Sequence, residues 1–144
     1  MNTLRIVNRT RDSVLGSRVL LADRWWQRVR GFLRRPEPVS GEGMLLSPCT
    51  AVHSLGLLFP LDVIFIDAGG RVVATYAPLQ PGRRTAWHHR ARYALELPNG
   101  TISASGTVEG DHIAWLAREH APANGGEGVH QGSRSGGDAS VDDA

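Results

Sequence analysis

The sequence predicts an α+β domain that is mostly β, with a compact, curled, barrel-like antiparallel sheet and one main helix near residues 23–35. Three observations lead to this fold class. Short runs of β-branched and aromatic residues recur along the chain, separated by turn residues. A single stretch has the spacing of an amphipathic helix, and strands and helices do not alternate as they do around a parallel sheet.

The N-terminal third is expected to contain two strands and the main helix. The strands are predicted at residues 4–7 and 14–22, around a turn at residues 11–13. Asp23 is predicted to cap the helix, and Pro36 and Pro38 to end it. Its apolar face would consist of Trp25, Trp26, Val29, Phe32 and Leu33.

The rest of the ordered chain is expected to be short strands joined by turns. Strands are predicted at residues 43–47, 52–57, 61–66, 71–76, 93–97 and 112–116. Residues 67–70 would form a hairpin turn, residues 78–84 a loop and residues 101–105 one helical turn. Residues 61–66 carry apolar side chains on both faces, which predicts a central strand.

The 144 residues fit a single globular domain at residues 1–118, followed by a disordered, Gly-rich, acidic tail at residues 119–144. The single cysteine excludes an intrachain disulfide, and the N-terminus has no apolar leader. The longest apolar run, near residues 55–66, is too short and too interrupted to span a membrane. We therefore expect a cytoplasmic protein without a membrane span.

Positive charge is concentrated near the N-terminus. Residues 1–35 carry nine arginines against Asp12 and Asp23, and the sequence contains no lysine. This makes nucleic-acid contact a lesser alternative function, but no helix-turn-helix or RNP-like motif accompanies it, so a solvated helix face is the simpler interpretation. The candidate partner surface on the helix comprises Arg24, Trp25, Trp26 and Arg28.

Asp62 is the most informative polar residue because it lies in the predicted central strand. A buried carboxylate needs hydrogen-bond donors or an opposite charge. Asp62 could cap the loop at residues 56–60, or it could form the floor of a pocket. His53 is the first candidate for its partner.

Cys49 and His53 lie four residues apart, and this spacing allows three interpretations. They could be half of a zinc site, with further nitrogens from His88 and His89, but a structural zinc usually needs four Cys or His ligands. They could be a nucleophile and its base, with Asp62 orienting the histidine. A buried, inert thiol is the simplest interpretation, so we expect no metal and no cofactor.

Glu96 lies in the predicted strand at residues 93–97, between two leucines. It could pair with Arg92 on the same face of the strand, or with a partner from the arginine-rich helix. It could instead lie beside His53 or Asp62 in one cleft, where two buried carboxylates would raise the pKa of one of them. The sequence spacing does not decide between these arrangements.

Five short motifs follow one another along the chain: R-G-F-L at residues 30–33, H-S-L-G-L at residues 53–57, F-P-L-D-V-I-F-I-D at residues 59–67, A-R-Y-A-L-E-L-P at residues 91–98 and Gly110-Asp111. In this order they resemble the bacterial and archaeal family known as domain of unknown function 192, also called uncharacterised protein family 127. Leu55, Leu57 and Leu58 stand where the family has a phenylalanine, a methionine and often a basic residue. A binding role of that thioether or cation would be lost here.

The resemblance implies a compact, mostly-β α+β fold and no settled reaction. We expect a non-enzymatic accessory or binding protein for a protein or small-molecule ligand, with a candidate pocket of Cys49, His53, Asp62 and Glu96. The alternative is a small enzyme that uses Cys49, His53 and Asp62.

Overall fold

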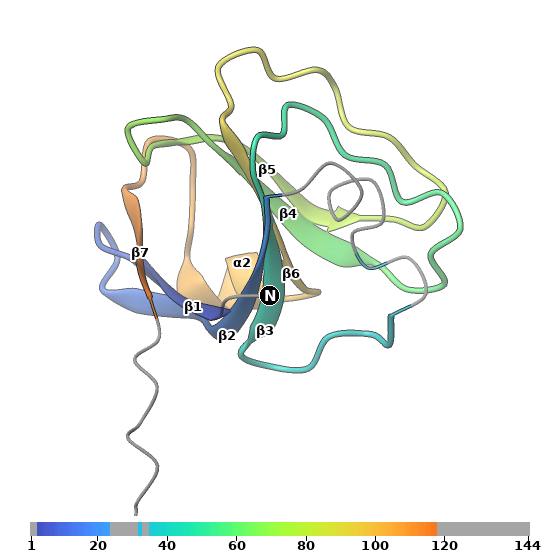
Figure 1. The fold of residues 1–144 in the computed structure, drawn as a ribbon, viewed down its shortest axis with the longest axis horizontal. Coiled ribbons are helices and arrows are strands. Elements are labelled where there is room, and N and C mark those ends of the chain that lie inside the picture. The colour runs from blue at the N-terminus through green and yellow to red at the C-terminus, as the bar shows by residue number, and fades with distance from the viewer. Residues whose placement is uncertain (1–2, 24–31, 33–34, 118–144) are drawn as a thin grey trace, which may run out of the picture.

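The computed structural model describes residues 3–23, 32 and 35–117, and these form one seven-stranded sheet with the order β5-β4-β6-β3-β2-β1-β7. The strands are β1 (Thr3–Asn8), β2 (Ser13–Ala22), β3 (Glu42–Leu46), β4 (Leu61–Ile66), β5 (Val72–Leu79), β6 (Tyr93–Pro98) and β7 (Ile113–Ala117). The single helix of these residues is α2 (Thr101–Ser105). Figure 1 shows the sheet curling into a half-barrel, with β1, β2 and β7 on one side and β4 and β5 on the other.

The predicted fold class is confirmed: the protein is mostly β, with a curled sheet. The ends of the sheet approach each other through backbone contacts between residues 70–72 and 111–113. The N–H of Ile113 donates to the carbonyl of Gly70 (2.7 Å), and that of Val72 to the carbonyl of Asp111 (2.9 Å). The main helix predicted near residues 23–35 and the tail predicted from residue 119 lie largely or wholly outside the described residues.

One strand pair departs from the predicted antiparallel arrangement. β2 and β3 pair in parallel, from Arg18 opposite Glu42 to Ala22 opposite Leu46. A parallel neighbour requires a crossover of a dozen or more residues, and residues 23–41 provide it. The other strand pairs of the described sheet are antiparallel.

The prediction of a strand at residues 52–57 is wrong. This segment is a loop with one isolated bridge, between His53 and Arg84. Backbone hydrogen bonds join it to the loop at residues 80–92, including Thr85 N–H to Val52 O (2.9 Å). The buried hydroxyl of Ser54 accepts from Arg83 N–H (2.9 Å) and donates to the carbonyls of Gln80 and Arg83, so it joins the same two loops.

Both faces of β4 are buried, as predicted for residues 61–66. All six residues of β4 are inaccessible to solvent or nearly so, and their side chains alternate between two apolar clusters. The inner face lies inside the curl, where Ile64 and Ile66 pack with Leu95, Leu97 and Ile102 of α2. The outer face carries a second cluster, which includes Met44, Val63, Phe65 and Ala94 and reaches Phe32.

A buried polar network holds the end of β1 against the turn before β7. The Asn8 side-chain amide donates to Asp111 Oδ2 (2.9 Å) and Thr107 Oγ1 (3.0 Å). Arg11 Nε and the Val108 N–H donate to the same carboxylate oxygen, each at 3.1 Å. The hydrogen bond from Asn8 lowers the pKa of Asp111 most, and burial raises it. The hydrogen bonds from Val108 and Arg11 lower it further, so the pKa of Asp111 lies below its ordinary value.

Candidate functional site

The two acidic residues of the candidate pocket lie on opposite faces of the sheet. In the β4–β6 pair, Asp62 stands opposite Leu97, whereas Glu96 stands opposite Val63. Paired residues of antiparallel strands point to the same face of the sheet. Asp62 therefore lies on the inner face with Leu97, and Glu96 lies on the outer face with Val63. The predicted cleft containing both carboxylates therefore does not form.

Asp62 supports the fold from the inner face. Its side chain is fully buried, and Oδ2 accepts a hydrogen bond from the N–H of Ile102 (2.8 Å), in the first turn of α2. Burial raises its pKa, and the backbone N–H groups of Ile102, Gly100 and Thr101 act in the opposite direction without cancelling the rise. Asp62 thus caps α2, and the predictions that it caps the loop at residues 56–60 or pairs with His53 are wrong.

His53 and Cys49 make local contacts on the loop that precedes β4. His53 is exposed, and its Nδ1 accepts from the N–H of Leu55 (3.3 Å). Cys49 is half-buried, and its Sγ donates to the carbonyl of Ala51 (3.2 Å). The structure does not bring Cys49, His53 and Asp62 together, and within the described ranges no three Cys, His, Asp or Glu side chains form a metal-sized cluster.

Glu96 occupies the middle of the outer face. The strand registers place it in a row across five strands, between Val63 of β4 and Met44 of β3, with Tyr76 of β5 and Leu20 of β2 at the two ends. Its side chain is 4% exposed although its neighbours in the row, Val63 and Met44, are apolar. We call this surface, with the cluster around Met44, Val63 and Phe65, the Glu96 face.

The Glu96 carboxyl is the unusual group of this face. Oε2 is buried and has no hydrogen-bond partner among the residues that the structure describes. Burial raises the pKa of Glu96 to about 7, because the ionised form loses its hydration without gaining a partner. The predicted pairing with Arg92 is not among the contacts of the carboxyl. Near neutral pH this group can therefore either donate or accept a hydrogen bond.

An aromatic cluster lies beside Glu96 on the same face. The Tyr76 hydroxyl lies 2.8 Å from His88 Nε2 and accepts from the N–H of Ala86 (3.0 Å). The His88 ring packs on Phe65, with ring centroids 4.5 Å apart. The sequence offered His88 only as a zinc ligand and did not indicate Tyr76. Their meeting depends on how the loop at residues 80–92 folds back over β4 and β5.

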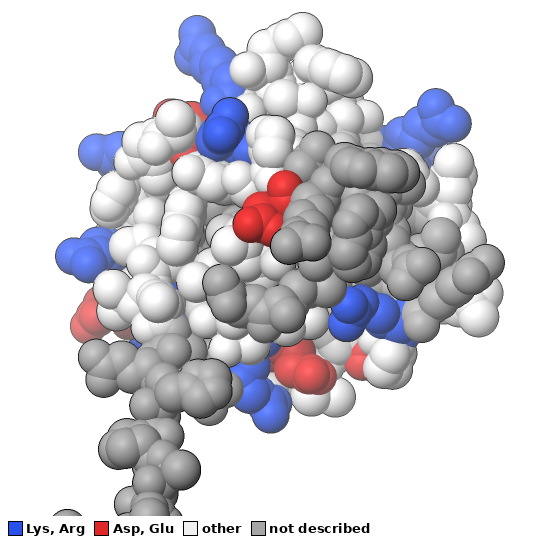
Figure 2. All heavy atoms as spheres, viewed as in Figure 1, with Lys and Arg blue, Asp and Glu red and all other residues white. Residues whose placement is uncertain are grey.

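The predicted partner surface of Arg24, Trp25, Trp26 and Arg28 lies outside the described residues and stays a prediction. On the face shown in Figure 2, the arginine atoms lie in several separate groups with white surface between them. Arg11 is already paired with Asp111. In the described ranges, no helix has the length and apolar character needed to cross a bilayer.

Comparison with known proteins agrees with the motifs and the fold. The model of the family of domain of unknown function 192, described as "Uncharacterized ACR", matches residues 6–115. This chain belongs to that family. A "UPF0127 protein" from Thermococcus sibiricus is 30% identical over 82% of this chain and 79% of its own length.

Two solved structures share the fold. A protein of unknown function from Novosphingobium aromaticivorans superposes with a TM-score of 0.68 at 22% identity, covering 78% of this chain and 84% of that one. A "putative transcription regulator" from Sinorhizobium meliloti superposes with a TM-score of 0.65 at 25% identity, covering 79% and 92%. One of these two structures is described as a protein of unknown function and the other as a regulator, so the shared fold does not by itself indicate what this member of the domain of unknown function 192 family does.

The acidic residues that carry the resemblance to the domain of unknown function 192 family have different roles in this chain. Asp62 caps α2, and Asp111 joins β1 to the turn before β7. Asp62 Oδ1 and Glu96 Oε2 are both buried without a hydrogen-bond partner in the described part of the chain. Asp62 accepts a hydrogen bond at its other oxygen, whereas no described residue donates to the Glu96 carboxyl, so Glu96 has the most unused capacity to bind a ligand.

Proposed function

We propose that this protein is a non-enzymatic binding domain that takes a small ligand on the Glu96 face. The observation that carries the proposal is the buried Glu96 carboxyl, whose Oε2 has no hydrogen-bond partner among the described residues. A buried polar group without a partner is destabilising, and a leucine or methionine would suit the row between Val63 and Met44 better. A group kept at a cost to stability fits a binding role.

The surroundings of Glu96 define the ligand's chemistry. Val63, Phe65 and Met44 surround the carboxyl in an apolar cluster that is closed to solvent, so the body of a ligand that reaches Glu96 should be apolar. The carboxyl requires one complementary group, either a hydroxyl or amide N–H donor or a protonated amine. A protonated amine would hold Glu96 ionised and would therefore bind more tightly as pH rises through 7.

Binding is favoured over catalysis by the separation of the candidate catalytic residues. A nucleophile and its base must lie within hydrogen-bond reach of each other. Instead Cys49 Sγ donates to Ala51 O, His53 Nδ1 accepts from Leu55 N–H, and Asp62 lies on the inner face. The enzyme built on these three residues lacks the geometry that its mechanism requires.

A nucleic-acid partner is the weaker candidate. The Sinorhizobium meliloti neighbour is described as a transcription regulator, which suggests a nucleic-acid partner, and the arginines of the N-terminal quarter are compatible with one. On the face shown in Figure 2 the basic residues do not form one continuous patch, which favours the small-ligand proposal instead. We also propose a cytoplasmic location, supported by a single cysteine and no disulfide.

Thermal-shift measurements on the full chain test the proposal. The probes are apolar amines and alcohols, each with a hydrocarbon of the same shape, and the proteins are wild type, Glu96→Gln, Glu96→Leu and Glu109→Gln. Glu109 is exposed and serves as the matched control. We expect at least one amine or alcohol to raise the Tm of wild type and Glu109→Gln but not that of Glu96→Leu.

The result that would overturn the proposal is equal stabilisation of wild type and Glu96→Leu, or stabilisation of neither by any probe. Glu96→Gln distinguishes the two ligand classes. A neutral donor should still bind the amide oxygen, whereas a protonated amine should bind at least tenfold more weakly, since it loses its charged partner.

A further inference from the structure

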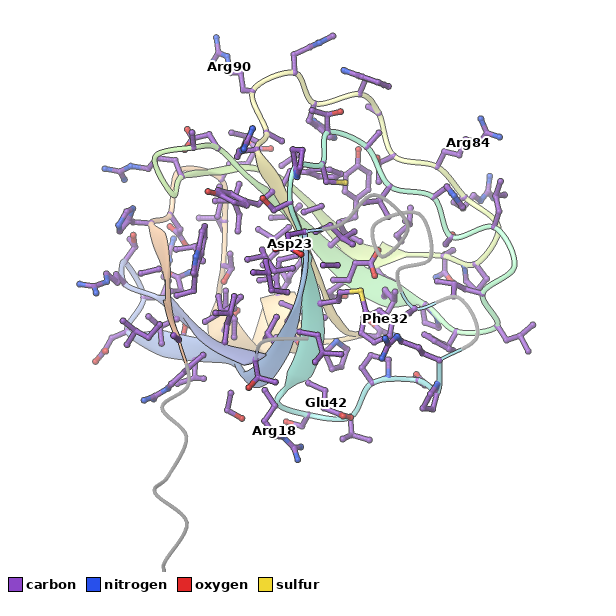
Figure 3. All side chains as sticks on the ribbon, in the orientation of Figure 1. Arg18, Asp23, Phe32, Glu42, Arg84 and Arg90 are labelled. Atoms are coloured by element: carbon purple, nitrogen blue, oxygen red, sulfur yellow. The ribbon has the colours of Figure 1, made fainter. Side chains whose placement is uncertain are left out.

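A cavity opens at the edge of the outer face, between β2, β3 and the chain that precedes β3. Its volume is about 240 Å³. Arg18, Arg35, Glu37 and Glu42 bring charge to it, and Leu20 and Phe32 contribute apolar walls. Figure 3 shows Arg18 and Glu42 together at the lower edge of the view, with Phe32 above them.

The charged groups of this cavity are not paired with one another. Arg18 and Glu42 are register partners on adjacent strands, a position where opposite charges commonly interact. Yet neither Arg18 nor Arg35 forms an ion pair with either of the two glutamates. Both signs of charge are therefore available to a ligand at one opening.

Two of these residues are held in place by the loop that leads to β3. Glu42 Oε1 accepts from the N–H of Val39 (2.9 Å), and the N–H of Glu42 donates back to the Val39 carbonyl (3.0 Å). The N–H of Arg35 donates to the carbonyl of Phe32 (2.9 Å), and its side chain is half-buried. The hydrogen bond to Glu42 Oε1 restrains that side chain, which lowers the entropy cost of its contact with a ligand.

The apolar part of the cavity belongs to the outer-face cluster. Phe32 is 6% exposed, and Leu20 packs against the same cluster. Leu20 stands opposite Met44, which in turn stands opposite Glu96, so the cavity is separated from Glu96 by one strand. Glu96 is not part of its lining.

We propose that this cavity binds a small zwitterion with an apolar side group, such as a free α-amino acid of the leucine or phenylalanine kind. The carboxylate of the ligand lies between Arg18 and Arg35, and its ammonium group contacts Glu37 and Glu42. The side group contacts Leu20 and Phe32. The cavity volume of about 240 Å³ lies below the roughly 300 Å³ at which cavities for drug-sized molecules begin, so it suits a smaller molecule such as an amino acid.

Isothermal titration calorimetry with L-leucine and L-phenylalanine tests this site on the full chain. 4-Methylpentanoate lacks only the ammonium group of leucine, and 3-methylbutylamine lacks only its carboxylate. We expect leucine to bind at least tenfold more tightly than either analogue. Arg18→Gln and Glu42→Gln should each weaken leucine binding at least tenfold, and the glutamine at position 42 keeps an acceptor for the Val39 N–H.

Arg90→Gln is the matched control, because Arg90 is exposed and lies at the opposite edge of the molecule in Figure 3. It should bind leucine like wild type. No leucine or phenylalanine binding at millimolar concentration would overturn the proposal. So would equal binding of leucine and 4-methylpentanoate with no effect of Glu42→Gln, since that pattern describes a simple anion site.

The outcome is independent of the function proposed for the Glu96 face. Glu96→Gln should leave leucine binding unchanged, because Glu96 does not line this cavity. A loss of leucine binding in Glu96→Gln would place the amino acid on the Glu96 face instead and would refute the assignment to the edge cavity.

Discussion

Replacing Glu96 by glutamine should change how the stability of the protein depends on pH. The pKa of Glu96 is about 7 in the folded protein, against 4.5 for an unperturbed glutamate. Between these values the folded state binds more protons than the unfolded state, so the free energy of unfolding falls as pH rises. The stability contributed by protonated Glu96 is fully present below pH 4.5 and is lost as pH rises through 7.

The magnitude follows from the two pKa values. The difference between 4.5 and about 7 corresponds to roughly 3 kcal/mol over the whole titration. About 2.5 kcal/mol of this lies between pH 5 and pH 8, where the measurement is practical. For a domain of this size that corresponds to roughly 10 °C in Tm.

The assay is urea denaturation of wild type and Glu96→Gln at pH 5, 6, 7 and 8, followed by circular dichroism. Other carboxyls titrate in both proteins, so the difference in unfolding free energy between them isolates Glu96. Glu96→Gln should gain about 2.5 kcal/mol relative to wild type between pH 5 and pH 8. A difference that stays constant within about 0.5 kcal/mol would refute the conclusion that Glu96 is buried without a partner.

Three further predictions concern groups with hydrogen bonds in the described structure. Asp62→Ala should destabilise the protein by about 1–3 kcal/mol in urea denaturation, because it leaves the Ile102 N–H buried without an acceptor; a change below about 0.5 kcal/mol would contradict this role. Asp111→Asn should cost stability at neutral pH. Because the pKa of Asp111 is lowered in the folded protein, the loss of unfolding free energy should disappear as pH falls through that pKa. A loss that persists in acid would contradict the conclusion that ionised Asp111 stabilises the fold. His53→Ala should change the unfolding free energy by less than about 0.5 kcal/mol, because His53 is exposed; a loss above about 1 kcal/mol would show that its contacts support the loop.

The sequence predicted the strands best where apolar runs were bounded by turn residues. β4 and its hairpin to β5 lie where residues 61–76 indicated, and α2 matches the helical turn predicted at residues 101–105. The segment at residues 52–57 misled because its apolar residues belong to a loop, in which Val52 is buried but Leu55 is exposed. Its backbone groups pair with the loop at residues 80–92 rather than with a strand of the sheet.

The parallel pairing of β2 with β3 could not be predicted from local pattern. β2 has ten residues and β3 has five, and the apolar residues of each could be buried with the strands in either relative direction. The direction depends on the path of residues 23–41, which carries the chain from the end of one strand to the start of the other.

The candidate site was predicted only in part, and the reason lies in the register of β4 against β6. Within one strand, side chains alternate between faces, so the sequence correctly places Asp62 with Ile64 and Glu96 with Ala94. Whether those two sets share a face depends on which residues stand opposite each other, and a shift by one residue reverses the answer. No residue in either strand specifies that register alone.

The same register explains why Asp62 and Glu96, which lie in similar apolar strands, differ in their hydrogen bonding. Asp62 faces inward, where α2 presents the N–H of Ile102 to it. Glu96 faces outward, where Val63 and Met44 offer no donor. Each carboxyl keeps one buried oxygen without a partner, Asp62 Oδ1 and Glu96 Oε2, but Asp62 also accepts the Ile102 N–H, whereas Glu96 accepts no hydrogen bond from a described residue. This difference makes Glu96, rather than Asp62, the residue at which a ligand would add the missing interaction.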